Sequence, residues 1–284
     1  MLYYCIFALI LRTFIGKSED IDQPIIYNFL YMRPNFGYKY PRPALTTDCV
    51  IFGFDVKEGI LKILLIERGI EPFLGKMALP GGFIQIKSET DEDGFVTKEL
   101  NESLETCACR ELLEETGFQA RYMSELGTFS TPGRDPRGVV ISDAFYALVI
   151  PTPVKGGDDA AEAKWLPFHE VLEVIEHMPK GFRFLAFDHD DIIRKAYRRL
   201  KEDICFEPIA FSLLPDVFSM TQLQQIYEEV LGREFDRRNF ARKVVDSGVL
   251  DALPHTGRNI YYSLNKERYE AMKNSGKRLK LIFV

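Results

Sequence analysis

Apolar stretches with the spacing of β-strands alternate with helical patterns over the first two thirds of the chain. The apolar stretches predict strands at residues 46–54, 60–66, 77–84, 122–129, 139–150 and 163–168. Helical spacing predicts a helix that Gly117 ends, a second helix over residues 169–175, and a third over residues 190–202. Strands and helices interleaved in this order indicate a mixed sheet covered by helices, which is an α/β fold.

The pattern changes after residue 204. Residues 221–224 offer a capping box for a helix that Gly232 ends, and Asp236 caps a second helix. Two short β-like runs follow at residues 249–253 and 260–264. The order helix, turn, helix, hairpin predicts a smaller C-terminal winged helix-turn-helix domain. We therefore divide the chain into an N-terminal extension of unknown role (1–43), an α/β domain (44–204) and a winged-helix domain with a C-terminal tail (205–284).

Charge is unevenly distributed between these parts. The net charge of −6 argues against a protein that coats nucleic acid along its whole surface. From Cys205 onward, however, 12 lysines and arginines face 10 aspartates and glutamates, whereas the rest of the chain has 24 against 32. The second helix of the winged-helix domain carries the candidate DNA-binding residues Arg237, Arg238, Asn239, Arg242 and Lys243. The cations suit phosphate contacts and the amide suits a base edge, so we predict binding of double-stranded DNA; the alternative is a packing module with solvated arginines.

Three carboxylates occupy one face of the helix that Gly117 ends. Glu111, Glu114 and Glu115 stand at positions i, i+3 and i+4, where like charges repel unless a cation lies between them. Hard oxygen ligands clustered in this way suit Mg²⁺ or Mn²⁺. The alternative, a solvated acidic helix face, is common, and the residues around the helix decide between the two.

The acidic helix lies within a longer pattern. The glycine-rich turn Leu79-Pro80-Gly81-Gly82-Phe83 precedes it. The fixed residues of the pattern are Gly82, Glu102, Arg110, Glu111, Glu114, Glu115 and Gly117. This set resembles the Nudix box, and the resemblance implies a Nudix α/β/α sandwich with a mixed sheet. One spacing differs, because residues 83–101 separate Gly82 from Glu102 where the family has only five residues; this acidic, turn-forming stretch predicts an inserted loop.

The resemblance implies hydrolysis of a diphosphate linkage with Mg²⁺ or Mn²⁺ as cofactor. Glu111, Glu114 and Glu115, with the Gly81 carbonyl, would hold the metal, and Arg110 would orient these carboxylates. Glu102 would support the turn or bind a second metal. The default general base is Glu115 or Glu114. An alternative base lies on the loop before Trp165, among Asp158, Asp159 and Glu162.

A second candidate site element is the loop of residues 132–138. Arg134 and Arg137 could clamp a diphosphate beside Gly82, as in ADP-ribose pyrophosphatase-like Nudix proteins; the alternative is a rigid turn with one internal Arg–Asp pair. Phe73 and Tyr146 are candidates for stacking on an adenine, although an aromatic residue in a strand is more often part of the core. We assign Trp165 to packing on the same ground.

Two segments, residues 211–218 and 231–240, look like the linker and recognition region of Nudix-related transcriptional regulators with a C-terminal winged helix. In many of those regulators the Nudix box has decayed, whereas here it is intact. Two functions follow. The first is a Mg²⁺-dependent hydrolase of ADP-ribose or a related nucleoside diphosphate derivative. The second is a DNA-binding regulator that senses ADP-ribose or a sugar without turnover. The two-fold symmetry typical of winged-helix binding, together with the resemblance, predicts a homodimer.

The composition predicts a cytoplasmic protein with no membrane partner. Five cysteines without metal-type spacing indicate reduced, buried thiols; Cys107 and Cys109 are two apart on a helix and cannot face one site. The apolar run at residues 2–10 is too short to span a bilayer.

Overall fold

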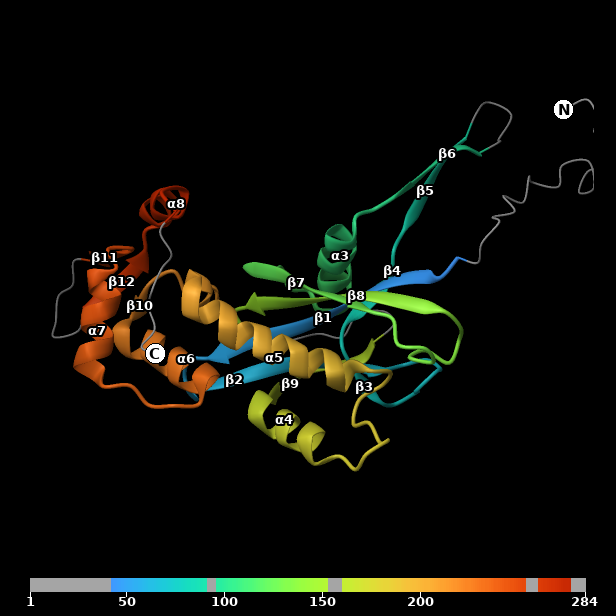
Figure 1. Ribbon diagram of the computed structural model, residues 1–284, viewed down its shortest axis with the longest axis horizontal. Helices are drawn as coiled ribbons and strands as arrows, with labels where there is room; N and C mark the ends of the chain where they lie inside the picture. Colours follow the sequence, from blue (N-terminus) through green and yellow to red (C-terminus); the bar gives the residue numbers. More distant parts are fainter. Residues whose placement is uncertain (1–41, 91–95, 153–159, 254–259, 277–284) are drawn as a thin grey trace, which may run out of the picture. The chain divides into compact units, whose positions relative to one another are not determined.

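The computed structural model describes residues 42–90, 96–152, 160–253 and 260–276 (Figure 1). Residues 1–41 of the predicted N-terminal extension, the candidate bases Asp158 and Asp159, and residues 254–259 between the last two strands lie outside these ranges. No helix in the described ranges is long and apolar enough to cross a membrane.

A mixed seven-stranded sheet organises the larger part of the molecule. Its strands are β1 (Ala44–Asp55), β2 (Ile60–Arg68), β3 (Met77–Ala78), β4 (Gly81–Phe83), β7 (Tyr122–Phe129), β8 (Val140–Val149) and β9 (Ala160–Pro167). The main order is β3-β2-β1-β8-β7, with β4 paired to β1 and β9 paired to β2. Among the described strands of this sheet, only β1 and β8 pair in parallel. The prediction of a mixed sheet is confirmed.

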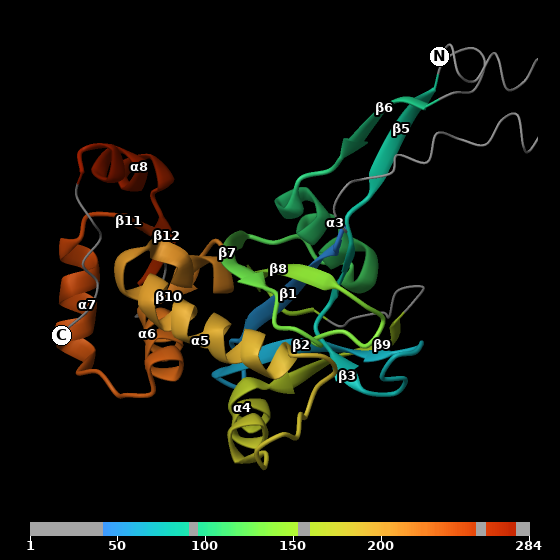
Figure 2. The same ribbon diagram turned by 45° about the vertical axis from the view of Figure 1, so that its right-hand side comes forward.

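The central strands are buried on both faces. In β1, Val50 and Phe52 belong to one buried cluster and Ile51 to the other, as the alternation of side chains along a strand requires. The helices that cover the sheet are α3 (Leu104–Thr116), α4 (Phe168–His177) and α5 (His189–Phe206). Helix α3 packs Ala108 and Leu112 on one face, and α4 and α5 lie on the other (Figures 1 and 2). The predicted α/β/α sandwich is confirmed.

The strand predicted at residues 77–84 is two strands, because its halves pair with different neighbours. Ala78 pairs with Ile66 of β2, whereas Gly82 pairs with Thr47 of β1. The chain changes partner at Leu79-Pro80, where proline has no N–H to continue a ladder.

The prediction of a loop at residues 83–101 is wrong. Most of the inserted segment is a two-stranded antiparallel hairpin, β5 (Ile86–Thr90) and β6 (Val96–Asn101), which projects away from the main sheet (Figures 1 and 2). Ile86 pairs with Asn101 at its base. The two ends of the insertion therefore meet, which brings Gln85 next to Glu102.

The C-terminal part has the predicted order of a winged helix. Its elements are a 3-10 helix η1 (Pro208–Leu213), β10 (Phe218–Ser219), α6 (Met220–Leu231), α7 (Arg237–Asp246), β11 (Leu250–Leu253), β12 (Tyr261–Leu264) and α8 (Lys266–Asn274). Gly232 ends α6 and Asp236 caps α7, as predicted. The capping box is two residues earlier than predicted, since Ser219 exchanges hydrogen bonds with Gln222. Helix α5 continues to Phe206, so our division after residue 204 falls inside this helix.

The four described cysteines, Cys49, Cys107, Cys109 and Cys205, are all free thiols. Cys107 is buried and Cys109 is exposed, so they face different surroundings as predicted. The expectation that the thiols are buried is wrong for Cys109, which is exposed, although its Sγ lies 3.7 Å from Met123 Sδ of β7.

Candidate active site

Two adjacent glycines hold the turn after β3 against its neighbours. A Cβ on Gly81 would lie 2.1 Å from the Thr47 carbonyl oxygen of β1, which is too close for any side chain. A Cβ on Gly82 would lie 2.3 Å from a carboxylate oxygen of Glu111 on α3. The Gly81 N–H also donates to Glu115 Oε2 at 2.9 Å. The glycine turn (residues 79–82) is thus packed between the central strand and the acidic helix.

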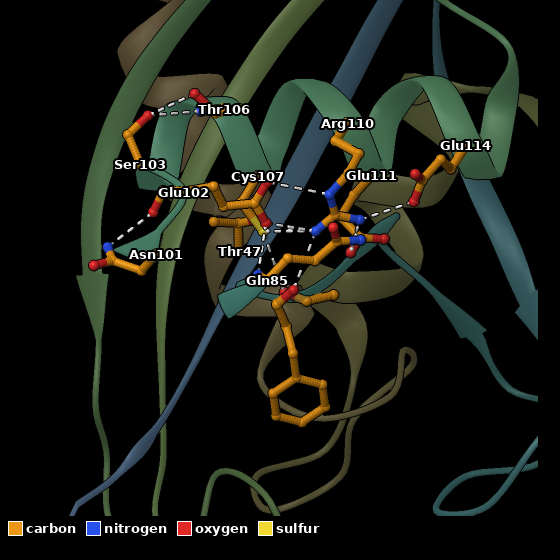
Figure 3. A network of polar contacts seen from close by, with 12 residues as sticks. Thr47, Gln85, Asn101, Glu102, Ser103, Thr106, Cys107, Arg110, Glu111 and Glu114 are labelled. Atoms are coloured by element: carbon orange, nitrogen blue, oxygen red, sulfur yellow. Dashed lines mark hydrogen bonds and ion pairs between the residues drawn. The ribbon is translucent and has the colours of Figure 1, made fainter. Parts of the chain in front are cut away.

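Arg110 contacts three of the four glutamates of the box (Figure 3). Its guanidinium donates to Glu102 Oε1 at 2.7 Å, to Glu111 Oε1 at 2.7 Å and to Glu114 Oε2 at 2.8 Å. It also donates to the Phe83 carbonyl at 3.1 Å, next to the glycine turn. Arg110 therefore connects α3 to Phe83, beside the glycine turn, and to Glu102, which follows the inserted hairpin.

The pKa values of Glu102 and Glu111 are shifted in opposite directions, although Arg110 acts to lower both. Hydrogen bonds from Arg110 lower the pKa of Glu102 from 4.5 to about 2. Glu102 also accepts a hydrogen bond from the Gln85 backbone N–H at 2.8 Å, so it supports the base of the inserted hairpin. Burial raises the pKa of Glu111, although Arg110 opposes this effect. Burial therefore disfavours the ionised form of the Glu111 carboxyl group.

The three glutamates of the helix have different surroundings. Glu111 and Glu115 line a cavity, whereas Glu114 is exposed and turned toward Arg110. Among the described residues no three acidic, histidine or cysteine side chains are grouped closely enough to hold a metal ion. The donor atoms nevertheless fit a hard cation, because oxygen atoms are the ligands that such ions prefer. The carboxylate oxygens of Glu111 lie so close to Gly82 that a Cβ there would not fit. Glu111, Glu115 and the adjoining Gly81 are the residues that fit such an ion.

The cavity beside this turn has a volume of about 340 Å³. Its wall includes Thr46, Asp48, Ile66, Arg68, Gly69, Ile70, Leu79, Gly81, Gly82, Phe83, Gln85, Arg110, Glu111, Glu115, Arg134, Asp135, Arg137, Phe187 and His189. The wall thus combines acidic residues of α3 with arginines from β2 and from the loop before β8.

Arg68 and Arg137 share an aromatic neighbour in this wall. Their guanidinium carbons lie 4.9 Å and 5.5 Å from the centre of the Phe187 ring. Arg137 is paired with the buried carboxylate of Asp135 at 2.7 Å, which is the internal pair that the sequence suggested as an alternative. Arg68 Nε donates to the Pro72 carbonyl at 2.7 Å, while its buried Nη2 has no partner among the described residues. Burial and the charge of Arg137 lower the pKa of Arg68.

Arg134 lines the cavity, but its guanidinium is occupied by other residues. It donates to Asp188 at 2.7 Å and to Asp48 at 3.1 Å, and its side chain is 4% exposed. Burial raises the pKa of Asp48, but its contacts with His189, Arg134 and Ser142 hold that pKa well below the usual range. The Arg134 guanidinium is therefore not free to bind a diphosphate, because it donates hydrogen bonds to two buried carboxylates.

The three aromatic candidates and Glu162 differ in their surroundings. Tyr146 is fully buried and donates to Asp203, which agrees with the core alternative and not with adenine stacking. Trp165 packs edge-on against Phe118, as expected for a packing residue. Phe73 packs edge-on against Phe187, which lines the cavity. Glu162 is exposed and paired with Lys164.

The candidate DNA-binding side chains lie together on α7. Arg237, Arg238, Asn239, Arg242 and Lys243 are all exposed. Phe240 and Val244 of the same helix are fully buried, so the helix presents one basic face and packs with the other. Arg242 donates to the Asn239 side chain at 3.0 Å.

Among the residues that sequence reasoning missed are Asp48, Arg68 and His189, which line the cavity, and Asp188, the buried partner of Arg134. Asp48 lies within β1, Arg68 ends β2, and Asp188 and His189 stand at the start of α5, all outside the Nudix box. The available signal was a charged residue within or just after an apolar strand. Asp48 lies within the predicted strand 46–54, and Arg68 follows the predicted strand 60–66. For Asp188 and His189 no local pattern separated them from an ordinary helix start.

Comparison with known proteins agrees with this geometry. The NUDIX domain family matches residues 42–186, and the NrtR DNA-binding winged helix domain family matches residues 210–259. An ADPR-responsive transcriptional repressor, NtrR, of Acinetobacter baylyi is 32% identical over 213 residues, which is 75% of this chain and 76% of the relative. An ADP-ribose pyrophosphatase of Methanocaldococcus jannaschii is 41% identical over 162 residues, which is 57% of this chain and 77% of the relative.

A solved structure shares both parts of the architecture. The crystal structure of Shewanella oneidensis NrtR has a TM-score of 0.60 and 31% identity, and covers 78% of this chain and 95% of that one. The structure of the same protein complexed with a 27mer DNA has a TM-score of 0.60 and 29% identity, and covers 83% and 97%. This chain belongs to the Nudix family, with a Nudix domain followed by a winged helix domain of the NrtR DNA-binding type.

Proposed function

We propose that this protein hydrolyses ADP-ribose, or a related nucleoside diphosphate derivative, with Mg²⁺, and that it binds double-stranded DNA through α7. The similarity to an ADP-ribose pyrophosphatase and to ADP-ribose-responsive NrtR regulators supports both parts of this proposal. The intact Nudix box favours turnover, because the box has decayed in many regulators of this type.

One observation carries the proposal: a single cavity has carboxylates on one wall and arginines on another. Glu111 and Glu115 flank the glycine turn, and Arg68 and Arg137 lie over Phe187. A diphosphate ester carries two negative charges and is bound in proteins by arginines and by metal ions held on carboxylates. A ligand with a metal-bound diphosphate therefore matches both walls at once.

The residues divide the work of hydrolysis. Nudix hydrolases generally use a divalent metal, which when bound neutralises charge on the diphosphate oxygens. Glu111, Glu115 and Gly81 would hold it. Arg110 orients Glu111 and supports the turn through the Phe83 carbonyl, while Arg68 and Arg137 hold the phosphate groups by charge-assisted hydrogen bonds.

The water that attacks phosphorus needs a carboxylate to accept its proton. Glu115 lines the cavity and is oriented by the Gly81 N–H, so it is the base that the geometry favours. Glu114 is exposed and accepts a hydrogen bond from Arg110. It could bind the metal only if this hydrogen bond breaks. Glu162 is paired with Lys164 and is the weaker alternative.

A second candidate function is ligand sensing without turnover. The observation in its favour is that Arg110 occupies the space between Glu111 and Glu114, so that no three-carboxylate group exists among the described residues. In that case the same cavity would bind ADP-ribose and change the affinity of α7 for DNA.

An assay of ADP-ribose hydrolysis with Mg²⁺ separates these functions. We expect turnover by the wild-type protein and at least a 100-fold loss in Glu115→Gln, because the general base alone supplies about 10²- to 10⁴-fold. Glu162→Gln is the matched control and should retain activity. An absence of turnover with ADP-ribose and other nucleoside diphosphate derivatives, combined with tight ADP-ribose binding, would establish the sensor instead.

The DNA-binding part is tested separately by gel shift against DNA upstream of the gene for this protein. Arg238→Ala should weaken binding and reduce the salt dependence by about one unit of slope, because one phosphate contact is lost. Arg183→Ala, at an exposed arginine of the Nudix domain, is the control. Equal affinity of wild type and Arg238→Ala would remove α7 from the interface.

A further inference from the structure

We propose that His189 is a positioning residue of the candidate active site, which holds the glycine turn in place through the Leu79 amide. The inference rests on the proposed function because it concerns the same cavity. It adds a role for the first residue of α5, which lies 110 positions from Leu79 in the chain.

The contact is buried and well formed. The Leu79 N–H donates to His189 Nδ1 at 2.9 Å, and the imidazole is only 2% exposed. His189 Nε2 lies 3.5 Å from Asp48 Oδ1, and both residues line the cavity. An imidazole nitrogen that accepts a hydrogen bond carries no proton. The ring is therefore neutral, with its proton on Nε2 toward Asp48.

The glycine turn depends on this contact because strand pairing does not reach Leu79. Strand β3 ends at Ala78 and β4 begins at Gly81. Between them, the Pro80 carbonyl accepts from the Cys49 N–H at 2.8 Å, and proline has no N–H of its own. The Leu79 amide is thus the group by which α5 holds the start of the turn.

The position of the turn determines the position of the carboxylates. The Gly81 N–H holds Glu115, and Gly82 leaves room for Glu111. A displacement of the turn by 1 Å would move the donor of Glu115 and close the space beside Glu111. Positional errors of about 1 Å reduce catalysis by about 100-fold.

Asparagine and leucine variants separate this role from simple packing. Asparagine places Oδ1 close to the position of histidine Nδ1, whereas leucine has a similar branched shape without an acceptor. In His189→Leu, hydrogen exchange of the Leu79 amide should accelerate about 10- to 100-fold relative to the Ile63 amide of β2, because a buried hydrogen bond is unmade. In His189→Asn, the ratio of the Leu79 to the Ile63 amide exchange rate should stay within a few-fold of the wild-type ratio.

Activity provides a second readout. His189→Leu should lower kcat about 10-fold or more with little change in KM, since the binding arginines are untouched, and His189→Asn should restore much of it. If wild type does not turn over ADP-ribose, the proposed hydrolase fails, but the exchange ratio still decides the role of His189.

A measurement on the unaltered protein guards against variants that fail to fold. In ¹⁵N-labelled protein, a scalar coupling between the Leu79 amide nitrogen and His189 Nδ1 reports the hydrogen bond directly, and the imidazole ¹⁵N shifts report its tautomer. We expect the coupling and an Nε2–H tautomer. An absent coupling with a protonated Nδ1, or equal exchange ratios in the leucine and asparagine variants, would overturn the proposal.

Discussion

Replacing Gly82 by alanine should remove function while leaving the fold largely intact. The new methyl group would lie 2.3 Å from Glu111 Oε1, whereas ordinary contacts begin near 3.4 Å, so the carboxylate must retreat by about 1 Å. Glu111 is at the far end of a flexible side chain and can move. Its retreat breaks the 2.7 Å bond from Arg110, which is itself fixed by Glu102.

The expected magnitudes differ between stability and activity. A hydrogen bond to a charged group contributes about 1.5–3 kcal/mol, but the displaced Glu111 carboxylate regains water, so we expect a loss of about 1 kcal/mol in the free energy of unfolding. Turnover of ADP-ribose should fall about 100-fold or more, because a carboxylate that would hold the metal is displaced by 1 Å.

Gly81→Ala is the matched comparison at the adjacent residue. Its methyl group would meet backbone atoms, the Thr47 carbonyl oxygen at 2.1 Å and the Asp48 Cα at 2.9 Å, and a central strand cannot move aside. This variant should lose about 1–3 kcal/mol or more of stability. Urea denaturation followed by circular dichroism measures both variants, and calorimetric titration with Mn²⁺ measures the metal site. Wild-type turnover and Mn²⁺ affinity in Gly82→Ala, or equal destabilisation of the two variants, would refute the reasoning.

Three further predictions concern charged groups. Because Arg110 lowers the pKa of Glu102 from 4.5 to about 2, the stability from this carboxylate is present above pH 4.5 and is lost as pH falls toward 2; Glu102→Gln should flatten the unfolding free energy over that range. Because burial raises the pKa of Glu111, its charge disfavours folding near pH 7; Glu111→Gln should match or exceed wild type in thermal stability and lose turnover. Asp188→Asn removes a partner of the buried Arg134 and should cost about 3–5 kcal/mol in chemical denaturation, with a loss below about 1 kcal/mol contradicting the buried pair.

The parts of the fold that the sequence predicted correctly are those with a local physical cause. Strand β1 places apolar side chains on both faces, and that pattern needs no knowledge of its partners. Gly117 and Gly232 end their helices with φ of 74° and 66°, a conformation that glycine adopts without strain. Asp236 caps α7 through the Asn239 amide, as an aspartate before a helix is expected to do.

The errors arose where structure depends on distant partners. Residues 77–84 have one continuous strand-like pattern, but β3 pairs with β2 and β4 pairs with β1. Turn-forming, acidic composition suggested a loop at residues 83–101, whereas the pairing of Ile86 with Asn101 closes a hairpin. Composition describes the preference of single residues and does not report which backbone groups meet across a turn.

The candidate site was predictable in full on one wall and only in part on the other. The box residues of α3 lie within two turns of one helix, so their mutual position follows from the helical repeat. The other wall brings Arg68 and Phe187 together with Arg137, which the resemblance had already indicated, and no periodic pattern joins these three segments. Arg134 shows the same limit, because its partner Asp188 lies 54 residues away and converts a candidate clamp into a buried ion pair.

Two locally unfavourable features face the same cavity and have opposite charge. The Glu111 carboxylate is held where burial opposes its ionisation, and Arg68 has a buried Nη2 without a partner among the described residues. Packing alone would not favour either feature, since an uncharged residue would fill each place at lower free energy. A cation beside Glu111 and an anion beside Arg68 would relieve both at once, and a metal-bound diphosphate supplies the two charges in one ligand. Both walls therefore fit a bound ligand equally in an enzyme and in a sensor, so only the measured fate of ADP-ribose distinguishes the two functions.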